Sequence, residues 1–472
     1  MRYFILATDY DGTLAHDGVT DDATIAALER FRASGGRPIL VTGRELPDLR
    51  QVFTRFDLFD RIVAENGGVM LDPATRRERV LGPHANQRFV EALRARGVSP
   101  LSVGRTIVAT VEPHERSALD AIRQLGLELH VVFNKGAVMM LPSGINKATG
   151  LCAALEDLGL SPHNVAGIGD AENDHAFLDV CELSVAVANA IPSLLDHVDI
   201  VTDGARGLGV QQLIDRLLAD EPEAILSPHR HWLTIGAADN HEATIEPHGS
   251  HVLICGPAGS GKSMLTTTLL EELAAARYQF CLIDPDGDYE EFPRGMSIGT
   301  SMAPPPIEEV ISALRRADQN VIVSLAALSE ADRPGYFASL VPRLGELGTR
   351  TGRPHWLIVD GAHQVLPSDW PATAAIAQGR WTSLALVTLN PQLVAPAALE
   401  VIDVLIAIGE LTRTTARTLE EKGFSANPRA VPAGQATIWN STSGPDGLLF
   451  SMRRPEESHR RPGRAYAERV RE

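Results

Sequence analysis

The chain is poor in cysteine and lacks a long uninterrupted apolar run. Its 472 residues include four cysteines, Cys152, Cys181, Cys255 and Cys281, which are far apart and form no Cys-x-x-Cys pair. This excludes a disulfide-rich secreted scaffold and favours three or four small buried thiols in a reduced cytoplasm. No apolar run in the sequence reaches the roughly 18 residues that a membrane-spanning helix needs, so we expect no membrane partner. The brief N-terminal apolar stretch ends in Thr8-Asp9 and predicts a first strand rather than a signal peptide.

Lysine is also scarce. The chain contains only Lys135, Lys147, Lys262 and Lys422, and its other basic residues are arginine. Two of the four, Lys147 and Lys262, lie in segments that have other features of phosphate-binding sites. A compositional bias with chance placement would give the same distribution, so the two lysines gain weight only from their neighbours.

Acidic residues outnumber basic ones, 60 to 43, which gives a net charge of -17 at pH 7. An acidic surface repels the phosphates of nucleic acids, so wide nonspecific nucleic-acid binding is disfavoured, although a local basic channel stays compatible with the composition. The hydrophobic content of 44% and charged content of 22% are typical of globular proteins. The length exceeds one ordinary core and predicts two or three domains.

The first half of the chain alternates short apolar strands with amphipathic helices, which is typical of a parallel α/β sheet. Between about 83 and 143 the pattern changes to helix, two strands, helix, two strands, which indicates an inserted α/β unit. We therefore predict a Rossmann-like α/β core from residues 1–82 and 144–219, with a cap at 83–143. The expected strands and helices are near 3–7, 22–33, 38–42, 61–64, 85–96, 101–103, 106–111, 113–125, 128–133, 137–141, 164–168 and 209–218.

The second half predicts another α/β domain. Residues 220–230 contain two prolines and no periodicity, and we interpret them as a linker. The domain is expected over 231–452, and the arginine-rich residues 453–472 are expected to form a solvated, mobile tail. The strands of this second domain are expected near 251–255, 279–283, 321–325, 356–360, 384–388 and 404–408.

Acidic, hydroxyl and ammonium groups occur in four segments of the first half, each at an expected strand end or helix start. The segments are Asp9-x-Asp11-Gly12-Thr13, Thr42-Gly43-Arg44, Gly-Ile-Asn-Lys147 and Gly-Asp170-Ala-Glu-Asn173-Asp174. In a strand, residues two apart share a face, and the carboxyl ends of parallel strands open into the ligand crevice. We therefore expect the four segments to converge, whereas an isolated Asp-x-Asp-Gly is often only a turn.

This set of groups suits phosphoryl transfer. A carboxylate that attacks a dianionic phosphate needs its charge cancelled, and Mg²⁺ held by Asp9, the Asp11 carbonyl and Asp170 would do so with hard oxygen ligands. Lys147 adds a point charge, and Thr42 can donate a hydrogen bond to a phosphoryl oxygen. Asp11 must first be neutral to protonate the leaving oxygen, and we expect the nearby Asp9 carboxylate to favour that neutral form.

The four motifs, their order and the insert after the second resemble the haloacid dehalogenase superfamily of Mg²⁺-dependent phosphatases. The subgroup is the one with a large α/β cap (subclass IIB, Cof-like), which includes sucrose-phosphate phosphatases, and Glu65-Asn66-Gly67-Gly68 is similar to a turn of those enzymes. The resemblance covers residues 1–219 and implies hydrolysis of a small phosphomonoester such as a sugar phosphate. It implies Asp9 as nucleophile forming an aspartyl phosphate, Asp11 as general acid and base, Thr42 and Lys147 as phosphate-binding residues, Asp170 as metal ligand, and Thr13, Gly43, Asn173 and Asp174 as supporting residues.

A second phosphate-binding motif lies in the second half. Gly256-Pro-Ala-Gly259-Ser-Gly261-Lys262-Ser263 matches G-x-x-x-x-G-K-[ST] between an expected strand and a helix over 264–276. The N–H groups of such a loop cradle phosphates, while the lysine reaches the terminal phosphates and the serine binds Mg²⁺. We expect ATP binding here, with Asp360 at the end of a buried strand near the Mg²⁺. The alternative is a glycine-rich loop without a ligand.

The segment Phe280-Cys-Leu-Ile-Asp284-Pro-Asp286-Gly-Asp288-Tyr resembles the second-strand motif of HerA/FtsK-type ATPases, and the resemblance covers about 231–440. It implies an ATPase fold and the possibility of a ring-shaped homo-oligomer. In that family the strand-end aspartate is followed by a glutamate that activates water, whereas Gly361 follows Asp360 here. This weakens the case for hydrolysis but not for ATP binding, and Asp286 or Asp288 is a candidate substitute.

Three functions remain open from the sequence. The first is a phosphatase acting on a small phosphorylated metabolite, regulated or localised by the second domain. The second is a HerA-like nucleic-acid motor with an accessory phosphatase, which the acidic charge and Gly361 disfavour. The third is an ATP sensor that gates the phosphatase. The cap sets the substrate. Its polar residues His84, His114, Asn134 and Lys135 are candidates for substrate contact, although we expect each of them to be an ordinary surface or packing residue.

Overall fold

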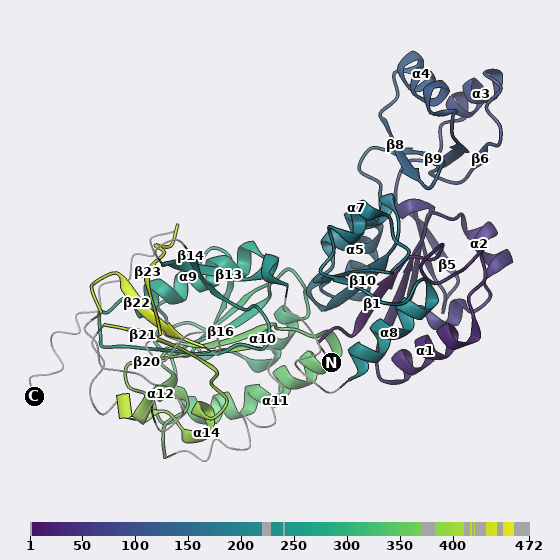
Figure 1. Ribbon diagram of the computed structural model, residues 1–472. Coiled ribbons are helices and arrows are strands. Elements are labelled where there is room, and N and C mark those ends of the chain that lie inside the picture. Colours follow the sequence, from purple (N-terminus) through teal and green to yellow (C-terminus); the bar gives the residue numbers. More distant parts are fainter. Residues whose placement is uncertain are drawn as a thin grey trace, which may run out of the picture. The chain divides into compact units, whose positions relative to one another are not determined.

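The computed structural model describes residues 2–219, 228–238, 241–369, 383–409, 416–417, 420, 431–440 and 447–456. The chain divides into two compact units, residues 1–228 and 229–472 (Figure 1). The expected linker lies outside the described residues except for 228–230, of which 229 and 230 begin the short 3-10 turn η6 (His229–His231).

The core of the first unit is a sheet with the strand order β12-β11-β10-β1-β2-β3-β4-β5. Its central strands are parallel and buried on both faces, which is why their sequences are continuous apolar runs rather than alternating ones. The strands are β1 (Ile5–Thr8), β2 (Arg37–Val41), β3 (Arg61–Ala64), β4 (Val69–Asp72), β5 (Arg77–Val80), β10 (Val165–Gly169), β11 (Leu183–Ala186) and β12 (Ile200–Val201).

Helices cover both faces of this sheet. One face packs against α1 and α8 through residues such as Phe31 and Leu213, and the other packs against α5 and α6 through Leu151 and Phe177. The helices and 3-10 turns are α1 (Asp22–Ala33), α2 (Leu46–Val52), η1 (Phe56–Leu58), η2 (Glu65–Gly67), α5 (Lys147–Leu158), η3 (Pro162–Asn164), η4 (Glu172–Asp174), α6 (His175–Val180), α7 (Pro192–Leu195) and α8 (Gly207–Leu218).

The sheet ends in an antiparallel hairpin that the sequence did not predict. β4 pairs antiparallel with β3, and β5 pairs antiparallel with β4. The sequence of β5, Arg77-Glu-Arg-Val80, is polar and partly exposed because β5 is the edge strand. Without an apolar run, this segment carries little strand signal.

The cap lies between β5 and α5 and has its own small core. Its antiparallel sheet has the order β6-β7-β9-β8, and its two helices lie on one face of that sheet (Figure 1). Phe89 and Leu93 of α3 and Ala118 of α4 pack on Val108 and Met140 of the sheet. The elements are α3 (Gln87–Ala95), β6 (Ser102–Val103), β7 (Val108–Val111), α4 (Glu115–Leu125), β8 (Leu129–Asn134) and β9 (Ala137–Pro142).

The second unit is built on a mixed sheet with the order β14-β13-β23-β22-β21-β15-β20-β19-β16-β18-β17. The six predicted strands, β15, β16 and β18 to β21, form its parallel centre, whereas β13, β14, β22 and β23 add an antiparallel edge. The strands are β13 (Leu233–Ala238), β14 (His241–Ile245), β15 (His251–Cys255), β16 (Phe280–Asp284), β17 (Met296–Ile298), β18 (Val321–Ser324), β19 (Trp356–Val359), β20 (Ser383–Thr388), β21 (Val404–Ile408), β22 (Gln435–Trp439) and β23 (Leu448–Met452).

Helix α9 covers one face of this sheet, and α10, α11 and α12 cover the other (Figure 1). The helices and turns are α9 (Lys262–Ala275), α10 (Ile307–Leu314), α11 (Arg333–Thr351), α12 (Ala362–Val365), η7 (Pro391–Leu393) and α14 (Pro396–Leu399). Among the described residues, no helix combines the length and apolarity needed to cross a bilayer.

The start of the predicted tail is exposed to solvent, yet it makes specific contacts with helix α9. The carbonyl of Arg453 accepts a hydrogen bond from Thr268 Oγ1 at 3.0 Å, and its guanidinium pairs with Glu272 of α9 at 2.6 Å. Strand β23, which lies between β13 and β22, leads directly into this contact, which the arginine-rich composition did not reveal. The remainder of that predicted tail, 457–472, lies outside the described residues.

Candidate active site

The acidic residues of the first unit lie at the carboxyl ends of three neighbouring strands. β1 has β10 on one side and β2 on the other, with Thr8 opposite both Ile168 and Leu40. Asp9 therefore follows β1 directly beside Asp170, which follows β10, and Thr42, which follows β2. Because the three strands are parallel, their ends share one edge of the sheet, as the sequence predicts.

Lys147 is the charged centre of this edge. The capping box of Asn146 and Thr149 starts α5 at Lys147 and turns its side chain into the core. Its ammonium donates to Asp9 Oδ1 at 2.5 Å and to Asp174 Oδ1 at 2.6 Å, and the side chain is 1% exposed. Burial lowers the pKa of Lys147, but Asp174 and Asp9 outweigh burial and hold this pKa above its usual range. A cation is thus fixed between two buried carboxylates.

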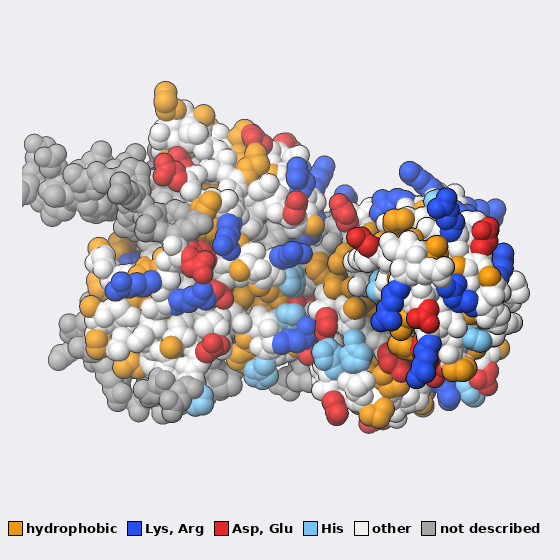
Figure 2. All heavy atoms as spheres, turned by 90° about the horizontal axis from the view of Figure 1, so that it is seen from above, with side chains coloured by type: hydrophobic (Ala, Val, Ile, Leu, Met, Phe, Trp, Pro, Cys, Tyr) orange, Lys and Arg blue, Asp and Glu red, His pale blue; other side chains and the backbone are white. Residues whose placement is uncertain are grey.

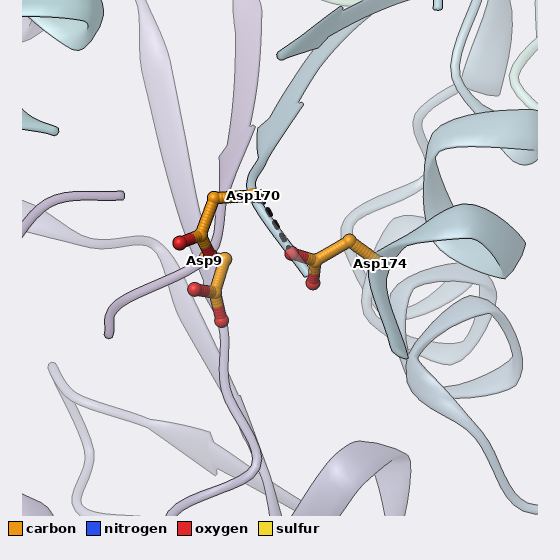
Figure 3. A group of neighbouring side chains, drawn as sticks. All are labelled: Asp9, Asp170 and Asp174. Carbon is orange, nitrogen blue, oxygen red and sulfur yellow. Dashed lines mark hydrogen bonds between the residues drawn. The ribbon is translucent and has the colours of Figure 1, made fainter. Parts of the chain in front are cut away.

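Three carboxylates of the site can share a metal ion. Oxygen atoms of Asp9, Asp170 and Asp174 lie within 4.8 Å of one another, and Figure 3 shows Asp9 and Asp170 side by side with Asp174 facing them. Burial raises the pKa of Asp9 and of Asp170, and the neighbouring carboxylates raise both further. Crowded hard oxygen donors of this kind suit Mg²⁺.

Asp174 is the least available of the three. Its Oδ2 accepts from the backbone N–H groups of Asp170 and Ala171 at 2.8 and 2.9 Å, while its Oδ1 accepts from Lys147. Asp174 therefore shapes the turn after β10, and Asp9 and Asp170 are the better candidates for direct metal ligands.

Asp11 is held by Arg44. The strand β1 ends at Thr8, so the expectation that strand geometry places Asp9 and Asp11 on one face does not apply. Both oxygens of Asp11 accept from Arg44, at 2.6 Å from Nε and 2.8 Å from Nη2, and Arg44 also pairs with Asp48 at 2.6 Å. The charged group that contacts Asp11 is thus the Arg44 guanidinium rather than the Asp9 carboxylate. Asp11 must leave Arg44 before it can act as an acid.

The other predicted residues of the site have identifiable contacts. Thr13 Oγ1 donates to Asp170 Oδ1 at 3.3 Å, and Asn173 Nδ2 donates to Asn66 Oδ1 at 2.9 Å. Thr42 is buried, and its Oγ1 accepts from the backbone N–H of Arg44 at 3.1 Å. A Cβ on Gly43 would find ordinary contacts of 3.6 Å or more, so steric space alone does not demand glycine there.

Lys135 was expected to be an ordinary cap residue, but the structure places it in the site. It lies in the turn between β8 and β9, and its ammonium donates to Asp170 Oδ2 in a short ion pair. Asn189 Nδ2 donates to the same oxygen at 3.3 Å. The scarcity of lysine was the one sequence signal that pointed to Lys135, since three of the chain's four lysines lie in the two proposed phosphate sites.

Glu65 joins the cap to the core. It follows β3, is 3% exposed, and accepts hydrogen bonds from the backbone N–H groups of Arg105, Thr106 and Ile107 in the β6–β7 turn, at 3.1, 2.8 and 3.3 Å. Thr106 Oγ1 adds a fourth hydrogen bond at 3.1 Å. The crowding is tight, because a Cβ on Gly68 would lie 1.7 Å from Thr106 Oγ1. One carboxylate therefore holds the cap turn against the core.

We expect Glu65→Ala to loosen this cap turn. Hydrogen bonds to a charged group contribute about 1.5–3 kcal/mol, so amide hydrogen exchange at 105–107 should accelerate by roughly 10- to 100-fold. Hydrogen exchange measured by mass spectrometry checks this result. Glu91→Ala on the exposed face of α3 is the control and should leave exchange at 105–107 unchanged. Equal exchange in the two variants would contradict the proposed role of Glu65.

The second unit carries its glycine-rich loop at the same kind of sheet edge. Residues 256–261 connect β15 to α9, and Gly259 and Gly261 have φ of 75° and 112°, which only glycine adopts readily. The ammonium of Lys262 donates to the carbonyls of Gly256 and Pro257 at 2.9 and 2.8 Å. The lysine thus lies over the loop where phosphates are expected.

The acidic residues of the second unit are held around this loop. Asp284 accepts from the backbone N–H groups of Gly287, Asp288 and Tyr289 at 2.9, 3.1 and 2.8 Å and so folds the turn after β16. Tyr289 then donates its hydroxyl to Asp360 at 2.8 Å, and burial raises the pKa of Asp360. Asp360 follows β19 at the same edge as the loop, because β15, β20, β19 and β16 are parallel neighbours.

The position after Asp360 has an unusual backbone. Gly361 has φ of 60°, and its ideal Cβ would lie 3.1 Å from Gln364 Nε2. Gln364 Nε2 in turn donates to Asp286 Oδ2 at 3.2 Å, which places one of the two candidate substitute carboxylates near the missing glutamate.

Comparison with known proteins assigns the two units. Residues 6–103 and 107–214 match the haloacid dehalogenase-like hydrolase family, and residues 245–332 match the central domain of helicase HerA. The chain is 31% identical over 223 residues to phosphoglycolate phosphatase 2 of Saccharolobus solfataricus, covering 46% of this chain and 92% of that protein. It is 30% identical over 227 residues to a phosphoglycolate phosphatase of Methanothermobacter thermautotrophicus. This match covers 45% of this chain and 98% of that protein.

Among solved structures, a haloacid dehalogenase-like hydrolase from Bacteroides thetaiotaomicron matches with 20% identity and a TM-score of 0.40, over 46% of this chain and all of that chain. The α/β class predicted for both units is confirmed, and so is the resemblance of each unit to its family. Through its first unit, the chain belongs to the haloacid dehalogenase-like hydrolase family.

Proposed function

We propose that the first unit is a Mg²⁺-dependent phosphatase that hydrolyses a small phosphomonoester through an aspartyl phosphate on Asp9. The observation that carries the proposal is the buried ammonium of Lys147 between Asp9 and Asp174, with Asp170 alongside. The names of the related enzymes favour a short phosphorylated acid such as 2-phosphoglycolate. A sugar phosphate, expected from the sequence, is the alternative substrate.

The chain's own groups account for both halves of the reaction. An oxygen of Asp9 attacks phosphorus, the bond from phosphorus to the leaving oxygen breaks, and Asp11, once released from Arg44, gives that oxygen its proton. Water then attacks phosphorus, gives its proton to Asp11, and the bond to Asp9 breaks. Lys147 positions Asp9, and Thr42 donates to a phosphoryl oxygen. Asp9 and Asp170 would hold Mg²⁺, which supplies the positive charge that lets two anions meet.

Assays with para-nitrophenyl phosphate and a panel of phosphorylated metabolites test this proposal. Metal chelation should abolish turnover, and added Mg²⁺ should restore it. Mg²⁺ should also raise the melting temperature of the wild type more than that of Asp170→Asn, because the ion relieves repulsion among the carboxylates. No turnover of any phosphomonoester in the presence of Mg²⁺ would refute the proposal.

For the second unit we propose ATP binding at Gly256, Gly259, Gly261, Lys262 and Ser263, with Asp360 near the Mg²⁺. We propose that this unit regulates or localises the phosphatase, in a cytoplasmic protein that forms homo-oligomers through this unit. A nucleic-acid motor is less favoured, since on the face drawn in Figure 2 acidic and basic side chains are interspersed rather than gathered into one basic field. Gly361, which stands where the family has a glutamate that activates water, also disfavours a motor.

Lys262→Ala should weaken ATP binding by roughly 10- to 100-fold, since the variant loses a charge-assisted contact to phosphate. Isothermal titration calorimetry with a nonhydrolysable ATP analogue measures this change. A steady-state ATPase assay of the wild type and the variant then tests hydrolysis. Wild-type turnover no faster than that of the variant would exclude the motor, and a mobility shift of DNA that weakens with salt would favour it.

A further inference from the structure

The contact of Lys135 with Asp170 brings a cap residue to the proposed phosphoryl-transfer site. Asp170 is fully buried, whereas the Lys135 side chain is 43% exposed and comes from the turn between two cap strands. The backbone N–H of Lys135 also faces Glu172 Oε2 at 3.3 Å, so the turn rests on the segment that follows Asp170. The ammonium therefore lies where the cap meets the core.

Lys135 and Mg²⁺ compete for the same carboxylate. Oδ2 of Asp170 accepts from the ammonium, and Asp170 is one of the two residues best placed to hold the metal. A divalent cation and an ammonium at one carboxylate repel each other strongly in a buried site. Metal binding therefore weakens the contact of the ammonium with Asp170 and favours its pairing with another anion.

The exposed stem of Lys135 allows that movement, and the cap turn limits how far it goes. A phosphomonoester bound with phosphorus at Asp9 directs its leaving group away from the strand ends, toward the cap. The phosphoryl group already has Lys147 and the metal as cations. An ammonium on the cap side is therefore placed to pair with a negative charge on the leaving group.

We propose that Lys135 is a specificity residue that binds a carboxylate on the leaving group of the substrate. This inference deepens the proposed phosphatase function and rests on it. A neutral sugar offers no charge to replace Asp170, so Lys135 selects phosphorylated acids over phosphorylated sugars and alcohols. The related phosphoglycolate phosphatases suggest the probe, since 2-phosphoglycolate differs from ethyl phosphate by a carboxylate in place of a methyl group.

The test compares these two ligands by calorimetry in an Asp9→Asn background, in which turnover cannot obscure binding, with Mg²⁺ present. Adding Lys135→Met should weaken binding of 2-phosphoglycolate by about 10- to 100-fold, the range of a hydrogen-bonded charge pair, and weaken ethyl phosphate binding by much less. Lys135→Arg should retain part of the preference. The control Arg116→Met removes a positive charge from the exposed face of cap helix α4. It should retain the full preference for 2-phosphoglycolate.

A second measurement does not depend on substrate. Without substrate, Lys135→Met should bind Mg²⁺ more tightly than the wild type, because no ammonium competes for Asp170. Steady-state selectivity in the Asp9-containing enzyme should follow the binding data, with a lower ratio of kcat/KM for 2-phosphoglycolate to that for ethyl phosphate.

Two results would overturn the inference. Equal weakening of both ligands would place Lys135 on the phosphoryl group, and unchanged binding of both would give it no role in recognition. Either result would leave the phosphatase intact if para-nitrophenyl phosphate is still hydrolysed. Absence of all phosphomonoester hydrolysis in the wild type would instead refute the proposed function, and the inference with it.

Discussion

Asp9→Asn should lower kcat for every phosphomonoester by roughly 10⁴-fold or more, the scale observed when a nucleophile is removed from other enzymes. The amide has the size of the carboxyl group but cannot form the acyl phosphate. Burst and steady-state phosphate release from the purified variant measure the effect. The loss should fall on kcat, because Lys147 and Thr42 remain to bind the phosphoryl group and Asp170 remains to hold Mg²⁺.

Folding should not confuse this result. Lys147 keeps its contact with Asp174 at 2.6 Å, and an amide oxygen can still accept from its ammonium. Asp48→Asn is the matched control, since Asp48 shares Arg44 with Asp11 but its side chain is 53% exposed and lies outside the metal cluster. A variant at Asp9 that kept a tenth of the wild-type kcat would rule out Asp9 as nucleophile.

Lys147→Met should abolish activity and also destabilise the first unit by about 3–5 kcal/mol, because removing one member of a buried ion pair leaves charge without a counter-charge. The ammonium is 1% exposed and serves both Asp9 and Asp174, so no water replaces it easily. Chemical denaturation followed by a spectroscopic probe of the first unit gives the free energy of unfolding.

A double variant separates the two effects of Lys147. Lys147→Met with Asp174→Asn removes one negative charge along with the positive one, so part of the lost stability should return while activity stays absent. A Lys147→Met protein as stable as the wild type would contradict the account of Lys147 as the charge that holds the site together. A recovery of activity in the double variant would contradict its role in catalysis.

The sequence predicted the parts of the site that depend on strand ends. Asp9, Thr42 and Asp170 each follow an apolar run, and parallel strands bring such positions together without further information. Lys147 was found in the same way, because it begins a helix after the cap. These are local signals whose spatial consequence is fixed by the sheet order.

The contacts between cap and core could not be predicted from the sequence. Lys135 is 35 residues from Asp170, and Glu65 is 40 residues or more from the cap amides that it binds, so no local pattern links them. Arg44 illustrates the same limit within the core, 33 residues from Asp11. Its pairing with Asp11 depends on the chain turning after Thr8, which an argument from strand periodicity could not include.

In the second unit, the buried centre of the sheet was predictable and its edges were not. β15, β16, β18, β19, β20 and β21 are apolar on both faces and gave clear runs. β13 and β14 are partly exposed, and β22 and β23 follow a stretch outside the described residues, so their pairing depends on long-range order.

The left-handed backbone at Gly361 bears on how the second unit, with its proposed nucleotide site, could change over time. A glutamate introduced there by a single exchange would carry its Cβ at φ of 60°, a conformation that disfavours side chains by roughly 1–2 kcal/mol, and would meet Gln364. Placing a glutamate at this position therefore also requires a change in the local backbone. A descendant of this chain would reach hydrolysis more readily by recruiting a carboxylate already present nearby, such as Asp286, than by replacing Gly361.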